Sequence, residues 1–332
     1  MIYRLVLALR HLAYDKGWKK THSAKVPTIC VGNITVGGTG KTPHTEMILR
    51  KLQENGRTNL AVLSRGYKRK SVGFQLAGPD ATARLVGDEP LQTARKFPSV
   101  KVAVDKNRIQ GCEKLADASL IILDDAFQYR KLNPTLSIVL VDYNRPIFED
   151  RLLPWGNLRD LPSQIRRAQI VIVTKCPAEL DEVERGEWRK RLKLADEQQL
   201  FFSTIQYCPA QPVFPEADQH YLYSQRLVLI SGIANNAPLR QYLSDTYKIV
   251  ERLEFPDHHR FTAGDIRSIA SALKTFPTSC LMTTEKDAQR LRDCKNVPEN
   301  IRRRLFYVPI QSVFLTEEED GTFTASLLNV AK

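Results

Sequence analysis

Residues 31–43 read VGNITVGGTGKTP, and this stretch decides the fold class of the chain. A β-rich apolar run precedes the glycines and a segment with helical periodicity follows them, which predicts a strand, a tight turn and a helix. Backbone N–H groups in such a turn can point inward at a phosphate. The strict P-loop pattern has a glycine where this sequence has Thr35, so a plain glycine-rich turn is the alternative.

The P-loop interpretation predicts that the chain binds ATP with Mg²⁺. We expect Lys41 to reach the β- and γ-phosphates and the Thr42 hydroxyl to hold the cation. The residues predicted to surround the phosphates are Gly37, Gly38, Thr39, Gly40, Lys41 and Thr42.

A second signal is the run SLIILDD at residues 119–125. A buried apolar strand that ends in acidic residues is where P-loop enzymes place a carboxylate for magnesium. If the strand persists, Asp124 and Asp125 point to opposite faces, so one binds the metal while the other orients it. The sequence leaves open which does which. Taken alone, the pair is equally explained as a helix cap.

The spacing of apolar runs predicts the architecture. Short runs that are apolar on both faces alternate with helical stretches, as in a parallel sheet covered by helices on each side. The expected strands are 26–34, 60–64, 100–104, 120–123, 138–142, 170–174, 228–230, 249–253, 280–283 and 305–308. The expected helices include 43–53, 107–116, 161–168, 179–193, 238–244 and 263–274.

This alternation predicts a P-loop NTPase-like, doubly wound α/β fold with a mostly parallel sheet and a second, smaller α/β domain. The length of 332 residues accommodates two compact domains. The expected parts are an N-terminal amphipathic helix at 1–20, a P-loop domain at 21–206, a linker at 207–225 and the smaller domain at 226–332.

The composition of the chain indicates which classes of partner it is expected to bind. The net charge of +12 favours an anionic partner such as lipid headgroups or a phosphorylated substrate. No nucleic-acid-binding signature accompanies the charge, so no nucleic-acid partner is predicted. The six cysteines include no C-x-x-C pair, which is typical of a protein from a reducing compartment without disulfides or structural zinc.

The first twenty residues predict an amphipathic helix, because apolar residues recur at i, i+3, i+4 and i+7. No stretch of the chain approaches the ~20 apolar residues that span a bilayer. Periodicity alone leaves two alternatives, a helix that lies in a membrane interface and a helix that packs on the domain core. The apolar stripe consists of Ile2, Leu5, Val6, Leu9, Leu12 and Ala13.

A kinase also needs a group that accepts the proton of the substrate hydroxyl. Asp88 lies in the predicted loop GDEP at 87–90, and Asp257, His258 and His259 form a second candidate cluster. Taken in isolation, each of these segments is better explained as turn chemistry.

Together these motifs resemble the tetraacyldisaccharide 4'-kinase family, the lipid A kinases of Gram-negative bacteria. The similarity runs in order from the first helix to about residue 291. Besides 31–43, the matching stretches are LSRGY at 63–67, VGDEP at 86–90, DDAFQ at 124–128, LLPWGNLRD at 152–160, SGIAN at 231–235, FPDH at 255–258 and TEKDA at 284–288.

The resemblance implies transfer of the ATP γ-phosphate to the 4'-hydroxyl of a tetraacylated glucosamine disaccharide 1-phosphate. It implies two α/β/α domains joined by a β linker, with the first helix on the cytoplasmic face of the inner membrane, peripheral or monotopic. No obligatory protein partner is predicted. It implies Asp88 as the catalytic base with His258 beside it, and Lys41, Thr42, Asp124 and Asp125 as the phosphate and metal ligands. It also implies that Thr284, Lys286 and Asp287 shape the nucleotide pocket.

The chain departs from the family pattern at three positions. Ala126 and Tyr129 stand where the family usually has glycine and histidine, and Asp160 stands where glutamate is common. Tyr129 offers a hydrogen-bonding hydroxyl in place of an imidazole, which leaves open what that position does.

Two other functions remain as alternatives. A membrane-associated P-loop ATPase switch would transfer phosphate only to water. A P-loop kinase of a soluble metabolite would not need residues 1–20.

Overall fold

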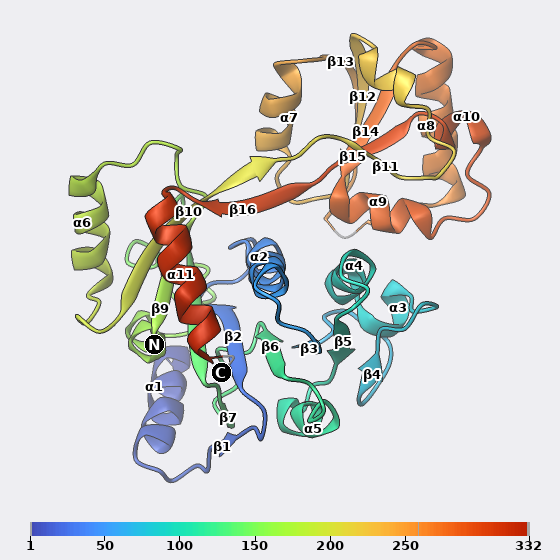
Figure 1. Cartoon of the computed structure of the whole chain (residues 1–332). Helices are drawn as coiled ribbons and strands as arrows, with labels where there is room; N and C mark the ends of the chain where they lie inside the picture. The colour runs from blue at the N-terminus through green and yellow to red at the C-terminus, as the bar shows by residue number, and fades with distance from the viewer. Residues whose placement is uncertain (1, 258, 331–332) are drawn as a thin grey trace. The chain divides into compact units, whose positions relative to one another are not determined.

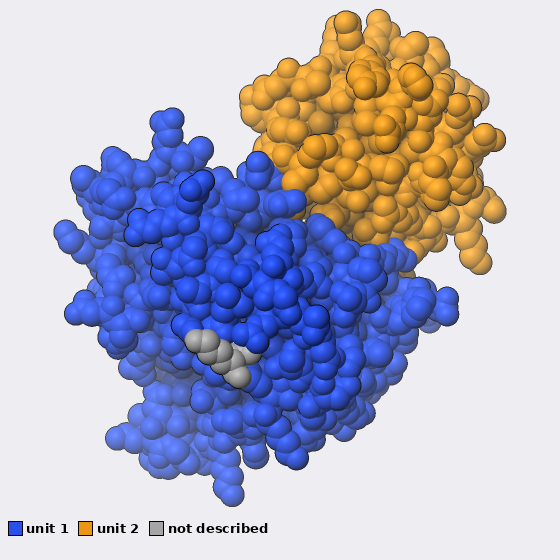
Figure 2. Space-filling view, in the orientation of Figure 1, with its two compact units in different colours: residues 1–206, 311–332 blue, residues 207–310 orange. Residues whose placement is uncertain are grey.

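The computed structural model describes residues 2–257 and 259–330. They form two compact units, unit 1 with residues 1–206 and 311–332, and unit 2 with residues 207–310 (Figure 2). Among the described residues, no helix combines the length and the apolarity needed to cross a bilayer.

A nine-stranded sheet forms the centre of unit 1, in the order β16-β10-β9-β8-β2-β6-β3-β5-β4 (Figure 1). The strands from β10 to β5 pair in parallel, and β4 is antiparallel to its neighbour β5. This confirms the doubly wound α/β class. The strands are β2 (Thr28–Asn33), β3 (Leu60–Ser64), β4 (Gln75–Leu76), β5 (Lys101–Val104), β6 (Leu120–Asp124), β8 (Leu136–Asp142), β9 (Ile170–Thr174), β10 (Gln199–Tyr207) and β16 (Ile310–Phe314).

Helices cover this sheet on both faces, because alternate residues of each buried strand enter two separate cores. Ile29 and Val31 of β2 pack in the core under α2, whereas Cys30 packs in the core under α5 and α6. The helices of unit 1 are α1 (Ile2–Asp15), α2 (Lys41–Glu54), α3 (Ala83–Val86), α4 (Asp88–Lys96), α5 (Arg108–Lys114), the 3₁₀ helix η1 (Pro162–Arg167), α6 (Glu182–Leu192) and α11 (Glu317–Val330). Two short strands, β1 (His22–Ser23) and β7 (Leu132–Asn133), pair separately in parallel.

The C-terminal segment belongs to unit 1, so the predicted boundary of the smaller domain at residue 332 is wrong. β16 joins the edge of the nine-stranded sheet beside β10. Phe323 and Leu327 of α11 are fully buried in the same core as α2, and Lys51 Nζ forms an ion pair with Asp320 at 2.6 Å. Apolar burial of these side chains, about 1.5–3 kcal/mol each, ties the end of the chain to unit 1.

Unit 2 is built on a five-stranded sheet in the order β11-β15-β14-β12-β13, parallel except for β11. The predicted linker 207–225 is part of this unit, because β11 pairs with β15 and the next residues, Val213 and Phe214, are buried in its core. The chain instead passes between the units through β10 and β16. The elements are β11 (Gln211–Pro212), the 3₁₀ helix η2 (Gln219–Tyr223), β12 (Arg226–Ser231), α7 (Ala237–Ser244), β13 (Lys248–Glu254), α8 (Ala263–Thr275), β14 (Cys280–Thr284), α9 (Glu285–Arg292), α10 (Glu299–Arg302) and β15 (Leu305–Val308).

Candidate active site

The predicted phosphate loop connects β2 to α2 at the carboxyl end of the parallel sheet, where ligands of such sheets bind. Gly37, Gly38 and Gly40 have φ of 74°, 42° and 85°, in the left-handed region that strains other residues. Gly40 is the N-cap of α2, and no side chain caps the first turn. The first N–H groups of the helix are therefore available to an anion.

Hydrogen bonds to the surrounding fold hold both ends of the loop. Thr39 is buried, its hydroxyl oxygen accepts a hydrogen bond from Asn33 Nδ2 at 2.7 Å, and its carbonyl accepts one from Thr174 Oγ1 at 3.1 Å. The Thr39 side chain thus points into the protein, and only its backbone remains for a phosphate. The other end pairs with residues 157–159, through Val36 N to Asn157 O at 2.8 Å and Arg159 N to Ile34 O at 2.9 Å.

Asp124 ends β6, directly beside β2, with Val31 as its partner in the register. Its side chain is 9% exposed, and its Oδ1 has no hydrogen-bond partner among the described residues. Burial, together with the negative charges of Glu89 and Asp125, raises the pKa of Asp124 to about 7, although Lys41 and Arg108 oppose the shift. A buried carboxylate with an unpaired oxygen is suited to a cation.

Asp125 lies outside the strand, so the expectation that two strand residues point to opposite faces does not apply. Its φ of 51° turns the chain out of β6. Lys41 Nζ lies 3.7 Å from Asp125 Oδ1, and Arg159 donates to both carboxylate oxygens, with Nη1 to Oδ2 at 3.1 Å. Burial would raise the pKa of Asp125, but the hydrogen bonds from Arg159 and the charges of Lys41 and Arg108 lower it on balance.

The residues present fit Mg²⁺. Thr42 lies in the first turn of α2, 7% exposed, and supplies a hydroxyl oxygen, while Asp124 supplies the unpaired buried oxygen. Within the described residues no three His, Cys, Asp or Glu side chains form a complete metal site. An incomplete set suits Mg²⁺, which usually binds through one or two carboxylates and completes its shell with water and substrate phosphate.

Asp88 begins helix α4, so the predicted loop at 87–90 is wrong as a structural assignment. Gly87, with φ 97°, is the N-cap, and a Cβ there would lie 3.1 Å from Tyr67 O. The start of α4 thus packs on the loop that follows β3, next to β6 in the sheet. Because the charge of Glu89 acts on Asp124, this helix start is close to the carboxyl end of β6. Asp88 itself is half-buried.

Helix α1 packs on unit 1 through the face that carries Tyr3, Leu7 and His11. Tyr3 Oη donates to Arg159 O at 2.9 Å, and His11 Nε2 lies 2.6 Å from a carboxylate oxygen of Asp160. The apolar stripe faces outward instead, with exposed fractions from 41% at Leu12 to 80% at Ile2. Of the predicted stripe, only Ala13 is half-buried.

A sequence model of the tetraacyldisaccharide-1-P 4'-kinase family matches residues 1–331. This chain belongs to that family. It is 42% identical to the tetraacyldisaccharide 4'-kinase of Bacteroides thetaiotaomicron over 96% of this chain and 88% of the relative. It is 41% identical to that of Flavobacterium johnsoniae, over 100% and 95%. The crystal structure of LpxK from Aquifex aeolicus in complex with ATP is similar, with a TM-score of 0.77, 28% identity and coverage of 100% and 96%.

Two arginines, Arg108 and Arg159, lie near the acidic residues of the site, and the sequence predicted no role for either. Arg159 closes the site by joining Asp125 to the Asn33 side chain. Arg108 begins α5 and is 3% exposed. Burial lowers the pKa of Arg108, while Asp124 and Asp125 oppose that shift. Arg159 lies in the LLPWGNLRD motif at 152–160, so the sequence could have indicated it. No local pattern distinguishes Arg108 from a surface arginine at the start of a helix.

The three departures from the 4'-kinase pattern have structural partners. Tyr129 Oη donates to Asn107 Oδ1 at 3.1 Å, and Asn107 caps α5. Ala126 is buried in the core. Asp160 is fully buried; burial would raise its pKa, but the hydrogen bond and charge of His11 lower it on balance.

In unit 2, the SGIAN and TEKDA motifs of the 4'-kinase family meet. Asp287 is fully buried, and its Oδ2 accepts hydrogen bonds from Gly232 N and Thr284 Oγ1, both at 2.8 Å. Its Oδ1 accepts one from Arg290 Nη1 at 2.8 Å. Both oxygens therefore serve the fold of this unit. Lys286 is half-buried, and His258 lies outside the described residues.

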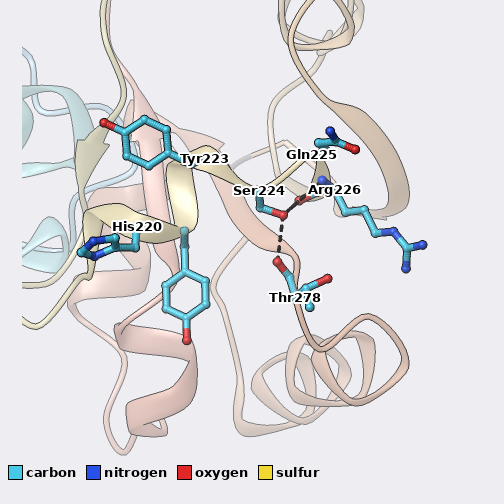
Figure 3. A pocket seen from close by; sticks show the side chains of 7 residues that line it. His220, Tyr223, Ser224, Gln225, Arg226 and Thr278 are labelled. Carbon is cyan, nitrogen blue, oxygen red and sulfur yellow. Dashed lines mark hydrogen bonds between the residues drawn. The ribbon is translucent and has the colours of Figure 1, made fainter.

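A shallow hollow of about 650 Å³ lies elsewhere in unit 2. Figure 3 shows Ser224 between Arg226 and Thr278, and its hydroxyl donates to Thr278 O at 2.8 Å. None of the residues predicted to bind nucleotide, metal or substrate lines this hollow.

Proposed function

We propose that this chain is an ATP-dependent kinase that transfers the γ-phosphate to the 4'-hydroxyl of tetraacyldisaccharide 1-phosphate, in lipid A biosynthesis. Family membership over nearly the whole chain supports the proposal. The observation that carries it is geometric: Lys41, at the open N-terminus of α2, lies 3.7 Å from Asp125, next to the unpaired oxygen of Asp124.

The chain's own residues act first on the triphosphate. The N–H groups from Gly37 to Thr42 surround the phosphate oxygens, and Lys41 neutralises charge that spreads over the transferring group. Arg159 holds Asp125 and thereby fixes the position of Lys41. Mg²⁺ held by Thr42, Asp124 and Asp125 would supply further positive charge to the phosphate oxygens.

Asp88 accepts the proton of the 4'-hydroxyl, with His258 as its partner on the family motif alone. A carboxylate oriented by an imidazole is a chemically sensible base for a sugar hydroxyl. Thr284, Lys286 and Asp287 contribute to the nucleotide pocket, Asp287 by holding the backbone of its segment rather than by touching the ligand.

The acylated substrate is reached at the cytoplasmic face of the inner membrane, where α1 lies in the interface. Two observations support this location: the apolar stripe of α1 is exposed, and Arg4, Lys16, Lys19 and Lys20 belong to the same segment. Each basic side chain near an anionic surface contributes about 1 kcal/mol of attraction.

The decisive experiment incubates the purified protein with labelled ATP, Mg²⁺ and tetraacyldisaccharide 1-phosphate in detergent. We expect labelled bisphosphorylated lipid. Release of free phosphate alone would indicate the ATPase switch, and transfer only to a water-soluble acceptor would indicate a metabolite kinase.

The membrane proposal has its own test. The double variant Leu5→Gln with Leu9→Gln should lose most binding to anionic vesicles in sedimentation. A matched control changes Val72 and Val183 to Gln, since these exposed apolar side chains lie outside α1. Equal vesicle binding by the two double variants would contradict the role of α1.

A further inference from the structure

Near the start of α2, a buried histidine contacts both the phosphate loop and the strands that carry the chain between the units. His44 is 2% exposed. Its Nδ1 lies 2.7 Å from Gly40 O and 3.2 Å from Ser312 Oγ of β16. Its Nε2 lies 2.9 Å from Ser203 Oγ of β10. No role given above explains a buried imidazole at this point.

The partners define the tautomer of the ring. A carbonyl oxygen can only accept, so Nδ1 carries the proton and donates to Gly40 O. Nε2 is then the acceptor, and the Ser203 hydroxyl donates to it, while the Ser312 oxygen accepts the weaker second branch from Nδ1. These contacts fit a neutral ring with one donor and one acceptor nitrogen, and burial, which lowers the pKa of His44, favours the same form.

The contact with His44 affects the orientation of the peptide between Gly40 and Lys41. Gly40 O accepts from both Nδ1 and the backbone N of His44, the latter at 3.1 Å. Across a trans peptide the C=O and the following N–H point in opposite directions, so holding this carbonyl fixes where the Lys41 N–H points. A Cβ on Gly40 would lie 3.3 Å from Nδ1, so glycine also makes room for the ring.

We propose that His44 is a positioning residue for ATP binding: it orients the Gly40–Lys41 peptide toward the phosphates and fastens that peptide to β10 and β16. The proposal rests on the kinase function proposed above. It predicts an effect on the KM for ATP that depends on which ring nitrogen is preserved, which a merely space-filling side chain would not show.

Two substitutions separate the ring nitrogens. In His44→Asn the amide nitrogen takes the place of Nδ1 and keeps the bond to Gly40 O, whereas in His44→Gln it takes the place of Nε2 and reaches Ser203. We expect the KM for ATP of His44→Asn to stay within about threefold of the parent, and that of His44→Gln to rise roughly tenfold, about the effect of one hydrogen bond. The kcat at saturating ATP should change less than KM in both variants.

The matched control is Thr45→Val, the neighbouring residue of the same helix. Thr45 is also 2% exposed, and its hydroxyl has no partner among the described residues, so its kinetics should equal those of the parent. Equal KM values in the Asn and Gln variants, or KM values that simply follow the thermal midpoints, would overturn the proposal.

If the histidine variants do not fold, the double variant Ser203→Ala with Ser312→Ala decides. This variant keeps the bond from Nδ1 to Gly40 O, as His44→Asn does, so a KM for ATP raised about two- to threefold supports the proposal. An unchanged KM, or a rise of about tenfold, overturns it. Affinity for a non-hydrolysable ATP analogue, titrated directly, separates this inference from the kinase proposal. A weakened affinity in His44→Gln would support the role of His44 even if the parent failed to phosphorylate the disaccharide.

Discussion

Each unit has a parallel strand followed by a helix, through the phosphate loop in unit 1 and directly in unit 2, and the two junctions treat their hydrogen-bonding groups in opposite ways. At the junction of β2 and α2, the N-cap is Gly40 and no side chain caps the helix. At the junction of β14 and α9, Thr284 accepts from Asp287 N at 3.1 Å, and Asp287 accepts from Thr284 and Gly232. The first junction keeps donors for a ligand, and the second satisfies its donors internally.

The acidic residues follow the same division. Asp124, beside the first junction, is buried with an unpaired oxygen and a raised pKa. Asp287, at the second, is buried with both oxygens hydrogen-bonded. A buried polar group without a partner costs about 1–3 kcal/mol or more, and such a cost is tolerated where a ligand completes the site. Incomplete hydrogen bonding, rather than the strand–helix geometry itself, therefore distinguishes the junction that we propose binds ATP.

The largest expected effect comes from removing the positive charge of Lys41 at the junction of β2 and α2, called the open junction because no side chain caps its helix. Lys41→Ala should lower kcat/KM for phosphate transfer about 10³-fold or more, some 4 kcal/mol of transition-state stabilisation, with little loss of stability. The matched control is Lys51→Ala in the same helix, whose amine pairs with Asp320. It should lower the thermal midpoint and leave transfer intact. Similar turnover in Lys41→Ala and the parent would refute the assignment of this site.

The second prediction sharpens the contrast between the two acids through pH. Asp124 has a pKa of about 7 in the folded protein, above its ordinary 3.8. Between these values the folded state binds more protons than the unfolded state, so the free energy of unfolding falls as pH rises from about 4 to about 7. Each pKa unit corresponds to about 1.4 kcal/mol.

Asp124→Asn should remove this decline, so that in EDTA at pH 8 the variant is at least as stable as the parent while phosphate transfer is lost. Urea unfolding of the parent and the variant at several pH values measures how the free energy of unfolding depends on pH. A parent and a variant with parallel pH profiles would show that Asp124 is not held at a raised pKa.

Local patterns were enough to predict most of the sheet. The runs 60–64, 170–174 and 305–308 coincide with β3, β9 and β15, because continuous apolar runs of this length are characteristic of buried parallel strands. The glycine-rich turn before α2 and the acidic residues at the end of β6 were also located, since each lies within a few consecutive residues, while their roles in binding phosphate and metal stay predictions.

Features that depend on distant pairing could not be predicted in this way. Residues 311–332 belong to unit 1 because β16 and α11 contact segments more than 100 residues away, and no local pattern reports that. Arg159 enters the site because residues 157–159 pair with the loop after β2. The start of α4 was mistaken for a loop because Gly87 and Pro90 favour turns, although proline is tolerated in the first turn of a helix.

The third prediction concerns the junction of β14 and α9, called the closed junction because its donors are satisfied internally. Asp287→Ala removes the buried acceptor of Gly232 N and one buried, charged acceptor of the Arg290 guanidinium, which should destabilise unit 2 by about 3 kcal/mol or more. Chemical unfolding followed by a probe placed in unit 2 measures this. The exposed Asp245 serves as control, and its change to Ala should cost less than about 0.5 kcal/mol. If the two variants unfold alike, the network around Asp287 does not stabilise the unit.

The smallest expected effect concerns two threonines that open helices α2 and α9. Thr284 caps α9 through its hydroxyl, so Thr284→Ala should lower the stability of unit 2 by about 1 kcal/mol. Thr42 caps nothing, so Thr42→Ala should lower Mg²⁺-dependent transfer without that loss of stability. Serine keeps the hydroxyl at either position and should restore stability at 284 and activity at 42. The same substitution, threonine to alanine, is made at both junctions. A loss of stability in Thr42→Ala and none in Thr284→Ala would contradict the distinction between an open and a closed junction.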